Sequence, residues 1–367
     1  MKPVPAIPWA TPVLWGHEEA FVADALKSTW ISGGPYVERF ERELASLLGV
    51  GFAGAVANGT AALHAAYLAL GIRPGDEIVV PGFAFMAAAN IALHVGAVPV
   101  FAEVDPDTWC ITAESIRRKL TPRTKAIVVI HSYGNVCDME SILALAKDKN
   151  IPVIEDAAES FGSLYNGRYS GTLGTIGIYS FQATKTITTG EGGMAVTNSK
   201  AIADRISLYR SHGLLRKRHY WHEVPGHNFR LTNMQAALGC AQLEKLDVIV
   251  RERERVHARY QTYLSRIDGM ITQRFTAGVK PVVWAIAAKL DPAAFPQGRD
   301  AVMTQMQEAG IETRPGFCAA SMMDFYCAPP LPVCEELSRQ IISLPTYPTL
   351  HDDQIEYICD CLERLRR

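Results

Sequence analysis

The sequence predicts an α/β protein in which a mostly parallel sheet lies between helices and a smaller C-terminal α+β region follows. Short β-branched runs alternate with helical stretches through the first two thirds of the 367 residues, as in sheets covered by helices on both faces. The sequence pattern changes beyond Asp247, where charged residues become frequent. Hydrophobic residues make up 48% of the chain, which is enough for a large core.

The expected strands of the parallel sheet are β-branched runs bounded by turn residues. In chain order they are Glu77–Val80, Val98–Glu103, Ala126–Ile130, Val153–Glu155, Ile176–Ser180 and Met194–Thr197. The intervening segments are long enough for crossover helices, for example Met139–Lys147.

One long charged helix, "VIVRERERVHARYQTYLSRI", is expected to connect the two parts of the chain. Beyond it we expect a strand at Pro281–Ala287 and helices near Asp300–Ala309 and Asp352–Arg366. The sequence therefore predicts a large domain over residues 1–247, with an N-terminal arm, and a small C-terminal domain over residues 248–367.

Composition argues against several classes of function. The net charge is -2, and "RKRHYW" is the one cationic aromatic cluster, so we expect no nucleic-acid partner. No apolar run approaches the roughly 20 residues that span a bilayer, so we expect no membrane association. Prolines interrupt the N-terminal segment "MKPVPAIPWATPVLWG" before a signal-like apolar core forms. We therefore expect a cytoplasmic protein.

The eight cysteines predict neither a disulfide framework nor a metal site. None forms a CxxC pair, and Cys359 and Cys361 make a single CxC on an expected helix. His219 and His222 form one HxxH pair, but no second pair of ligands has zinc-like spacing. We expect reduced thiols and no bound metal.

The segment "ANGTAALHAAYLALG" joins a turn of small residues to the start of a helix. Such a turn points free backbone N–H groups outward, and the Thr60 hydroxyl adds a donor, so the segment is suited to bind an anion. Simple capping of the helix by Asn58 explains the same residues equally well.

Asp156 ends the apolar run of "IPVIEDAAESFG", which places it at the carboxyl end of a buried strand. Ligands bind at this edge of α/β sheets, and a carboxylate there can pair with a protonated ring nitrogen. Capping of the next segment by Asp156 is the alternative. Phe83 and Phe85 follow another strand, where an aromatic ring either stacks on a flat heterocycle or fills the core.

Lys185 lies in "IYSFQATKTITTGEGGM", after Ser180 and before a glycine-rich turn. Most lysines are simply solvated. Together, however, these segments supply a phosphate site, an acidic partner for a pyridine nitrogen, an aromatic ring and a lysine able to form a Schiff base. One cofactor needs all four, and it is pyridoxal 5'-phosphate.

The chain resembles the sugar aminotransferases of the DegT/DnrJ/EryC1/StrS family, which have the fold of the type I pyridoxal phosphate enzymes. The resemblance is collinear over nearly the whole length. It rests on "WISGGPYVERFE", "NGTAALHAAYLALGIRPGDEIVVPGFAF", "GAVPVFAEVDPDT", "TPRTKAIVVIHSYGN", "IEDAAESFGSLYNGR", "GTLGTIGIYSFQATKTITTGEGGM" and "GHNFRLTNMQAALGCAQLEKLD".

The resemblance implies that Lys185 binds the cofactor covalently and that Asp156 keeps the ring nitrogen protonated. Glu159 would contact the ring or its phenolic oxygen, and Phe85 would stack on the ring face. The implied phosphate contacts are Gly59, Thr60, Ser180 and, from the other subunit of a homodimer with shared sites, Asn228.

Within the family, "KTITTGEGGM", "RHYWHEV" and "LHDDQIEYICDCL" are most similar to the GDP-perosamine synthases. The resemblance implies transfer of the amine of glutamate, through pyridoxamine phosphate, to a nucleotide-linked 4-keto-6-deoxy sugar. The implied acceptor is GDP-4-keto-6-deoxymannose, which gives GDP-perosamine. The implied substrate contacts are Trp30, Tyr220, Arg314 and Ser321.

Two departures from the family pattern concern the sugar. Ala319 and Ser321 occupy the proline and histidine positions of R-x-x-F-x-P-x-H, and "FQATK" replaces "FFGNK", which places Thr184 before the lysine. Another acceptor therefore stays open: a 3-keto, UDP- or dTDP-linked sugar, or a cyclitol. A non-catalytic homologue that only binds the cofactor is a further alternative, against which the intact Lys185 argues.

Overall fold

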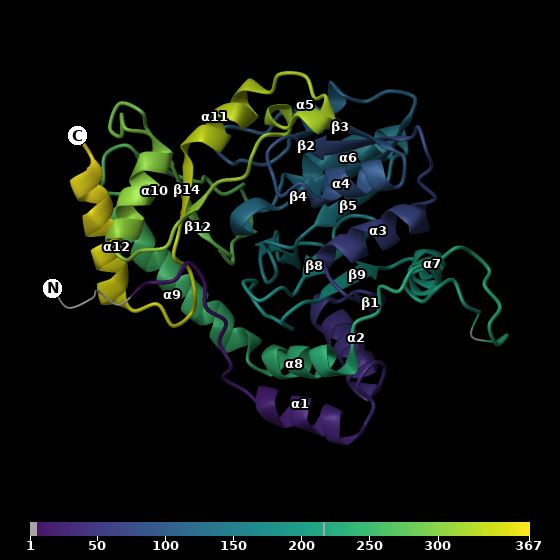
Figure 1. Cartoon of the computed structure of the whole chain (residues 1–367). Coiled ribbons are helices and arrows are strands. Elements are labelled where there is room, and N and C mark those ends of the chain that lie inside the picture. Colours follow the sequence, from purple (N-terminus) through teal and green to yellow (C-terminus); the bar gives the residue numbers. More distant parts are fainter. Residues whose placement is uncertain (1–5, 216) are drawn as a thin grey trace.

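The computed structural model describes residues 6–215 and 217–367. Residues 1–5 of the expected N-terminal arm and Arg216 of the "RKRHYW" segment lie outside the described residues. Figure 1 shows a larger sheet flanked by helices, a smaller sheet near the C-terminus, and a long helix, α9 (Leu246–Leu264), that leads from the first part of the chain to the second.

Within the described residues, the larger sheet has seven strands in the order β1-β9-β8-β5-β4-β2-β3. Their bounds are β1 (Phe52–Val56), β2 (Glu77–Pro81), β3 (Val98–Ala102), β4 (Thr124–Ile130), β5 (Val153–Asp156), β8 (Ile176–Ser180) and β9 (Gly193–Thr197). Strands β3, β2, β4, β5 and β8 pair in parallel, and β9 is antiparallel to both neighbours. The prediction of a mostly parallel sheet is confirmed.

Alternate side chains of the central strands bury against opposite layers of helices. Val80 and Val128 pack with α3 (Gly59–Leu70) and α4 (Ala87–His94) in one core. Val79 and Val129 pack in a second core with α6 (Met139–Lys149), beside the short helix α5 (Ala113–Arg117). This period of two along buried strands gives the sheet two apolar faces.

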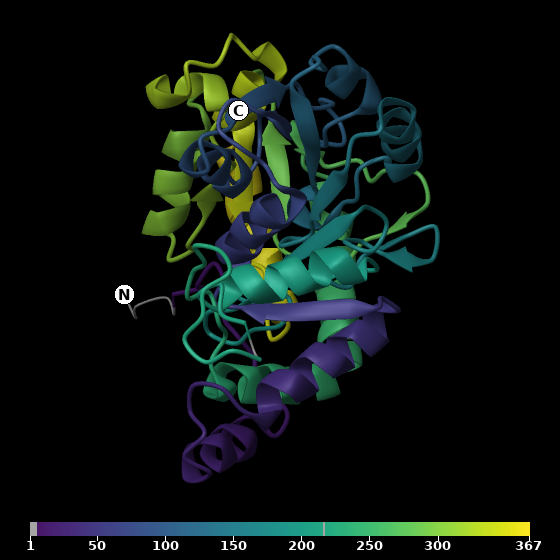
Figure 2. The same cartoon turned by 90° about the vertical axis from the view of Figure 1, so that its right-hand side faces the viewer.

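A third core covers the β9 side of the sheet. It is formed by α2 (Pro35–Leu48), α8 (Asn233–Glu244) and side chains of β1, β8 and β9. Helix α1 (Glu18–Lys27) lies beyond α8, and α7 (Lys200–Arg210) packs on α3. Figure 2, turned by 90°, shows α1 and α2 at the bottom of the view.

The C-terminal part of the chain builds a separate sheet of four strands in the described residues, ordered β10-β12-β14-β13. The strands are β10 (Met270–Thr272), β12 (Ile286–Leu290), β13 (Arg314–Pro315) and β14 (Ile341–Leu344), with helices α10 (Arg299–Glu308), α11 (Pro332–Gln340) and α12 (Asp352–Leu365). Short 3-10 turns span Ser132–Gly134, Ala320–Met322 and Asp324–Tyr326. A small third sheet joins β11 (Val279–Lys280) to β6 (Leu164–Tyr165) and β7 (Arg168–Tyr169).

The strand expected over Pro281–Ala287 begins later, because β12 starts at Ile286. The carbonyl groups of Val283 and Trp284 instead accept hydrogen bonds from a buried arginine, Arg253. Residues 281–285 of the expected strand therefore lie outside the ladder, and Ile286 and Ala287 pair with β14.

Helix α9 (Leu246–Leu264) is the long charged helix that the sequence predicts. It packs against α8 at its start and against α12 further on. The expected boundary at 247 and 248 falls in its first turn, and the two-domain division stays a prediction. Ile7, from the expected N-terminal arm, packs in the core of the C-terminal sheet.

All eight cysteines lie in the described residues and are free thiols, of which Cys318 and Cys327 are exposed. No helix in the described part of the chain is both long and apolar enough to cross a membrane.

The buried carboxylate of Glu155, on β5, fixes the loop that precedes β8. It accepts backbone N–H groups from Gly171 at 2.9 Å, Leu173 at 2.6 Å and Gly174 at 2.5 Å. His131 Nε2, also fully buried, lies 2.9 Å from the same carboxylate. The loop is thereby pressed onto β8, where only a glycine fits opposite Gly171.

Gly177→Ala should destabilise the fold by about 3 kcal/mol or more, since overpacking a tight interior forces the backbone to shift. A Cβ at residue 177 would meet the Gly171 carbonyl oxygen well inside contact distance. Gly33→Ala is the matched control, because nothing lies within 4 Å of its added Cβ. Urea denaturation measures both, and equal midpoints for the two variants would contradict the packing seen here.

Candidate active site

A cavity of about 870 Å³ opens at the carboxyl edge of the larger sheet. Its lining comes from the ends of β4, β5 and β8, the start of α3, and segments near β13 and β14. The predicted site residues that line it are Gly59, Thr60, Phe85, Asp156, Glu159, Ser180, Lys185 and Arg314. Residues far apart in sequence thus meet in one place, as the positions of the strand ends predict.

Four predicted residues lie outside this lining in the described chain. Trp30 and Tyr220 are 63% and 84% exposed, and Asn228 is exposed beside a bridge to Ser211. Ser321 is half-buried, and its hydroxyl donates to Glu335 Oε1 at 2.8 Å. A single chain therefore does not bring these four side chains to the cavity.

The start of α3 forms one end of the cavity. Asn58 Oδ1 accepts the Ala61 N–H at 2.8 Å, so Asn58 caps the helix as the simpler interpretation expects. The N–H groups of Gly59 and Thr60 precede the first intrahelical hydrogen bond and are available to a ligand. A Cβ at Gly59 would lie 3.1 Å from Ser180 Cβ, so glycine permits the close approach of α3 to β8.

Asp156 and Glu155 are neighbours on β5 and point to opposite faces, so only Asp156 reaches the cavity. Asp156 is 6% exposed, and its Oδ1 accepts the Ala158 N–H at 3.1 Å. Burial raises the pKa of its carboxyl group, while Lys185 and His131 act in the opposite direction. No cation of the described residues forms a direct ion pair with it.

The Lys185 amine lies against aromatic and acidic groups. Its Nζ is 3.8 Å from the centroid of the Trp284 ring. Burial lowers the pKa of the lysine, and the nearby Glu159 and Asp156 carboxylates oppose that shift. Such a lysine can lose its proton far more readily than one on the surface, which favours nucleophilic and acid–base chemistry.

Glu159 is a second buried acid in the cavity wall. It is 3% exposed, and its Oε2 accepts the backbone N–H of Tyr133 at 2.9 Å. Burial raises its pKa to about 7, against the effects of Lys185 and of the Tyr133 N–H. Tyr133 itself has a φ of 58°, an uncommon value for a residue that is not glycine.

Aromatic side chains form the wall around the lysine. The Tyr133 ring stacks with Phe317 at 5.1 Å and with Trp284 at 6.2 Å between centroids. Phe85 is 64% exposed and lines the cavity, whereas Phe83 is fully buried in the core. Sequence reasoning missed Tyr133, Trp284 and Phe317, although Tyr133 follows β4 at the same strand edge that identified Asp156.

The donor set matches the cofactor that the sequence predicts. Free N–H groups at the start of α3, with the Thr60 and Ser180 hydroxyls, are suited to a phosphate. A buried Asp156 carboxylate without a cationic partner in the described residues is suited to a protonated ring nitrogen. Lys185 is the amine that such a site requires.

The substitutions that set this chain apart lie partly in the cavity. Gln182 and Thr184 both line it, and Gln182 Oε1 accepts the Thr184 N–H at 2.8 Å and its hydroxyl at 2.7 Å. Cys318 also lines it, whereas Ala319 is buried and forms a bridge with Phe83.

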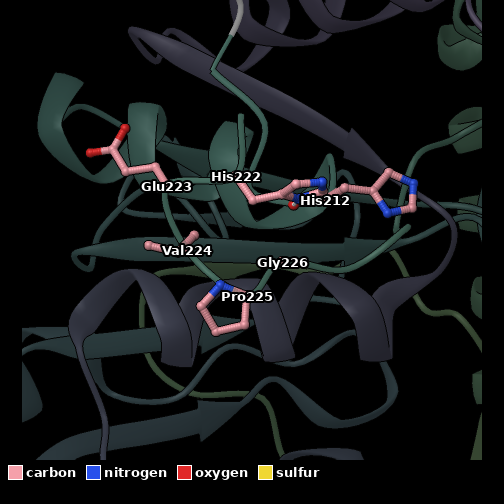
Figure 3. A pocket seen from close by; sticks show the side chains of 6 residues that line it. All are labelled: His212, His222, Glu223, Val224, Pro225 and Gly226. Atoms are coloured by element: carbon pink, nitrogen blue, oxygen red, sulfur yellow. Dashed lines mark hydrogen bonds between the residues drawn. The ribbon is translucent and has the colours of Figure 1, made fainter. Parts of the chain in front are cut away.

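A second hollow, of about 340 Å³, lies in the loop after α7 and shares no lining residue with the first. Figure 3 shows the residues around it: His212, His222, Glu223, Val224, Pro225 and Gly226. His222 Nδ1 donates to the His212 carbonyl at 2.7 Å. Across residues 6–215 and 217–367, no group of three or more His, Cys, Asp or Glu is placed to hold a metal.

Comparisons with known proteins agree with this geometry. The model of the DegT/DnrJ/EryC1/StrS aminotransferase family matches residues 15–363. The chain is 41% identical over 360 residues to the GDP-perosamine synthase of Escherichia coli O157:H7, covering 97% of each. It is 39% identical over 370 residues to the GDP-perosamine synthase of Caulobacter vibrioides, covering 100% of each. The aminotransferase TlmJ from Streptoalloteichus hindustanus superposes with a TM-score of 0.93 at 32% identity, covering 98% of each chain.

Glu159→Gln should remove a pH dependence of stability in the cofactor-free protein. The folded chain holds a proton on Glu159 up to about pH 7, but the unfolded chain releases it near 4.5. The free energy of unfolding should therefore fall by about 3 kcal/mol as the pH rises through this window. The glutamine variant keeps the Tyr133 hydrogen bond and should lack that fall.

Denaturant titrations between pH 4.5 and 8 measure the difference between the two proteins. Glu114→Gln is the control, since Glu114 is 57% exposed and pairs only with surface arginines in the described chain. Parallel pH profiles for wild type and Glu159→Gln would show that Glu159 is not a buried acid.

Proposed function

Since the chain belongs to the DegT/DnrJ/EryC1/StrS aminotransferase family, we propose that it transfers the amine of glutamate to C4 of GDP-4-keto-6-deoxymannose, giving GDP-perosamine. The observation that carries this proposal is the convergence of Thr60, Asp156, Ser180 and Lys185 on one cavity. The full-length similarity to two GDP-perosamine synthases supports the choice of acceptor.

The cofactor is pyridoxal 5'-phosphate, as in the family. When bound, it supplies a carbon that bonds covalently to amines and a ring that withdraws electrons from the reacting carbon. We assign its phosphate to the start of α3, the Thr60 hydroxyl and Ser180, and its ring nitrogen to Asp156. Phe85 would cover one face of the ring, and Glu159 would contact its polar edge.

Lys185 is the general acid and base in this proposal. Its Nζ, with a pKa lowered by burial, removes the proton from Cα of glutamate. In the second half-reaction the same nitrogen would deliver a proton to C4 of the sugar, because the ketone carbon bears no hydrogen and gains one on amination. Asp156 would assist by keeping the ring nitrogen protonated, so that the ring can take up the negative charge that develops on the reacting carbon in both transfers.

Aromatic rings form part of the cavity wall beside Lys185. Tyr133, Trp284 and Phe317 surround the lysine with rings, which strengthens the electrostatic interactions inside. Arg314 forms an ion pair with Glu312 at the cavity rim and is 56% exposed. We assign Arg314 to an anionic part of a substrate, such as the diphosphate or a glutamate carboxylate.

The active unit in this proposal is a homodimer. Trp30, Tyr220 and Asn228 are exposed in the single chain, and Leu26 and Ile31, which are close to Trp30 in sequence, add exposed apolar surface. A second copy would cover this surface and bring Asn228 to the phosphate and Trp30 and Tyr220 to the sugar nucleotide. Ser321, bonded to Glu335, would act on the substrate only indirectly.

Incubation with glutamate and each of several keto sugar nucleotides tests the reaction. We expect 2-oxoglutarate release with GDP-4-keto-6-deoxymannose, and a GDP preference over other carriers of about tenfold or less in kcat/KM. Lys185→Ala should fold yet release none, and it should lose the covalent cofactor seen by mass spectrometry after borohydride reduction. Amination confined to a 3-keto sugar or a cyclitol would refute the assigned acceptor.

Mixing two inactive variants tests the shared site. Hybrid dimers of Lys185→Ala and Asn228→Ala subunits contain one undamaged site, so random exchange should restore up to about one quarter of wild-type activity. Subunit exchange is followed separately with differently tagged chains. Proven exchange without any recovery would mean that each site is built from one chain.

A further inference from the structure

Arg253 is a buried cation on α9, directly behind the cavity wall. It is 4% exposed. Its guanidinium donates to the carbonyls of Trp284 at 3.0 Å, Val283 at 3.4 Å and Lys185 at 3.3 Å. One side chain thus joins the main chain of the cavity lysine to the segment that leads into β12.

Among the residues that the structure describes, no ion pair accounts for the charge of Arg253. Arg255 and Arg259, on the same helix, both pair with Asp352, at 2.6 Å and 3.4 Å. No carboxylate of the described residues pairs with Arg253, whose burial lowers the pKa of its guanidinium to about 10. Burying an unpaired cation is costly, so its three carbonyl contacts must offset much of that cost.

The lysine segment is held from a second side as well. Trp284 Nε1 donates to the Thr184 carbonyl at 2.9 Å, and the Trp284 ring lies 3.8 Å from Lys185 Nζ. Two successive carbonyls, those of Thr184 and Lys185, are therefore each fixed by a different side chain. Arg253 also binds the Trp284 carbonyl, so it positions both the lysine and the ring beneath its amine.

We propose that Arg253 is a positioning residue for Lys185, which holds the lysine main chain and Trp284 in register so that the amine stays over the indole ring. The inference rests on the catalytic role proposed for Lys185. A planar guanidinium suits this task because its fixed fork of donors reaches several carbonyls at once, whereas a lysine ammonium cannot reproduce that geometry.

The buried charge has a second effect on the same amine. Groups that face Lys185 are Glu159 and Asp156, which raise its pKa, and Arg253, which acts with burial to lower it. Removal of the guanidinium should therefore both loosen the amine and make it more basic.

Competitive acetylation of the cofactor-free protein across a pH series, read by mass spectrometry, tests this without any substrate. In Arg253→Met, the apparent pKa of Lys185 should rise relative to wild type, because a nearby positive charge is removed. In the loaded enzyme, the single-turnover rate with glutamate should fall at least about tenfold, with little change in half-saturation. Arg255→Met, which removes a neighbouring arginine that does not contact Lys185, should change neither quantity.

Arg253→Lys distinguishes the effect of the guanidinium geometry from the effect of its charge. It also tests the proposal if Arg253→Met does not fold. It should keep the wild-type labelling profile but lose single-turnover rate, because the charge stays and the fork is lost. A wild-type rate in folded Arg253→Lys, or a labelling profile and rate in Arg253→Met equal to those of Arg255→Met, would overturn the proposal. The labelling result stands even if the protein aminates none of the tested sugars, so the two proposals fail separately.

Discussion

The architecture depends on one buried carboxylate, Glu155, which takes three backbone N–H groups and a histidine while its neighbour Asp156 faces the cavity. Because successive residues of a strand alternate between faces, one dipeptide supplies both a structural anchor and an acid in the cavity wall. The anchor presses the loop of Gly171 onto β8, and β8 in turn carries Ser180 and leads to Lys185. Without this anchor, the loop would no longer hold β8 in place, and the Ser180 hydroxyl and the Lys185 amine would lose their fixed positions relative to each other.

Much of the fold could be predicted because buried parallel strands are continuous β-branched runs, which the sequence displays from Glu77 to Thr197. β1 was missed because Phe-Ala-Gly-Ala-Val contains few residues that favour strands. The strand forms through its pairing with β9. The cavity residues next to strand ends and in family motifs were predicted together. Arg253 could not be found, since its helix is rich in charges that mostly face solvent and only tertiary packing singles it out.

The protonation states of the ionisable groups in the cavity are set by their environment rather than by residue type. Two acids and one amine share a space walled by rings, and burial pushes the acids and the amine toward their neutral forms while their mutual attraction opposes this. A bound heterocycle that carries a positive charge would tip Asp156 back to its ionised form. Within the described residues, the site therefore lacks a positive charge opposite Asp156 until a ligand supplies one. Shifted pKa values of this kind are common at functional centres.

The cavity of about 870 Å³ also has a consequence for the lifetime of the protein. Any molecule that binds the folded chain and not the unfolded one raises the free energy of unfolding in proportion to the logarithm of its concentration over its dissociation constant. A ligand present at about a hundred times that constant contributes about 2.7 kcal/mol. Chains that have not yet acquired the vitamin-derived cofactor would open more often and be degraded first, so enzyme abundance would follow cofactor supply without a dedicated regulator.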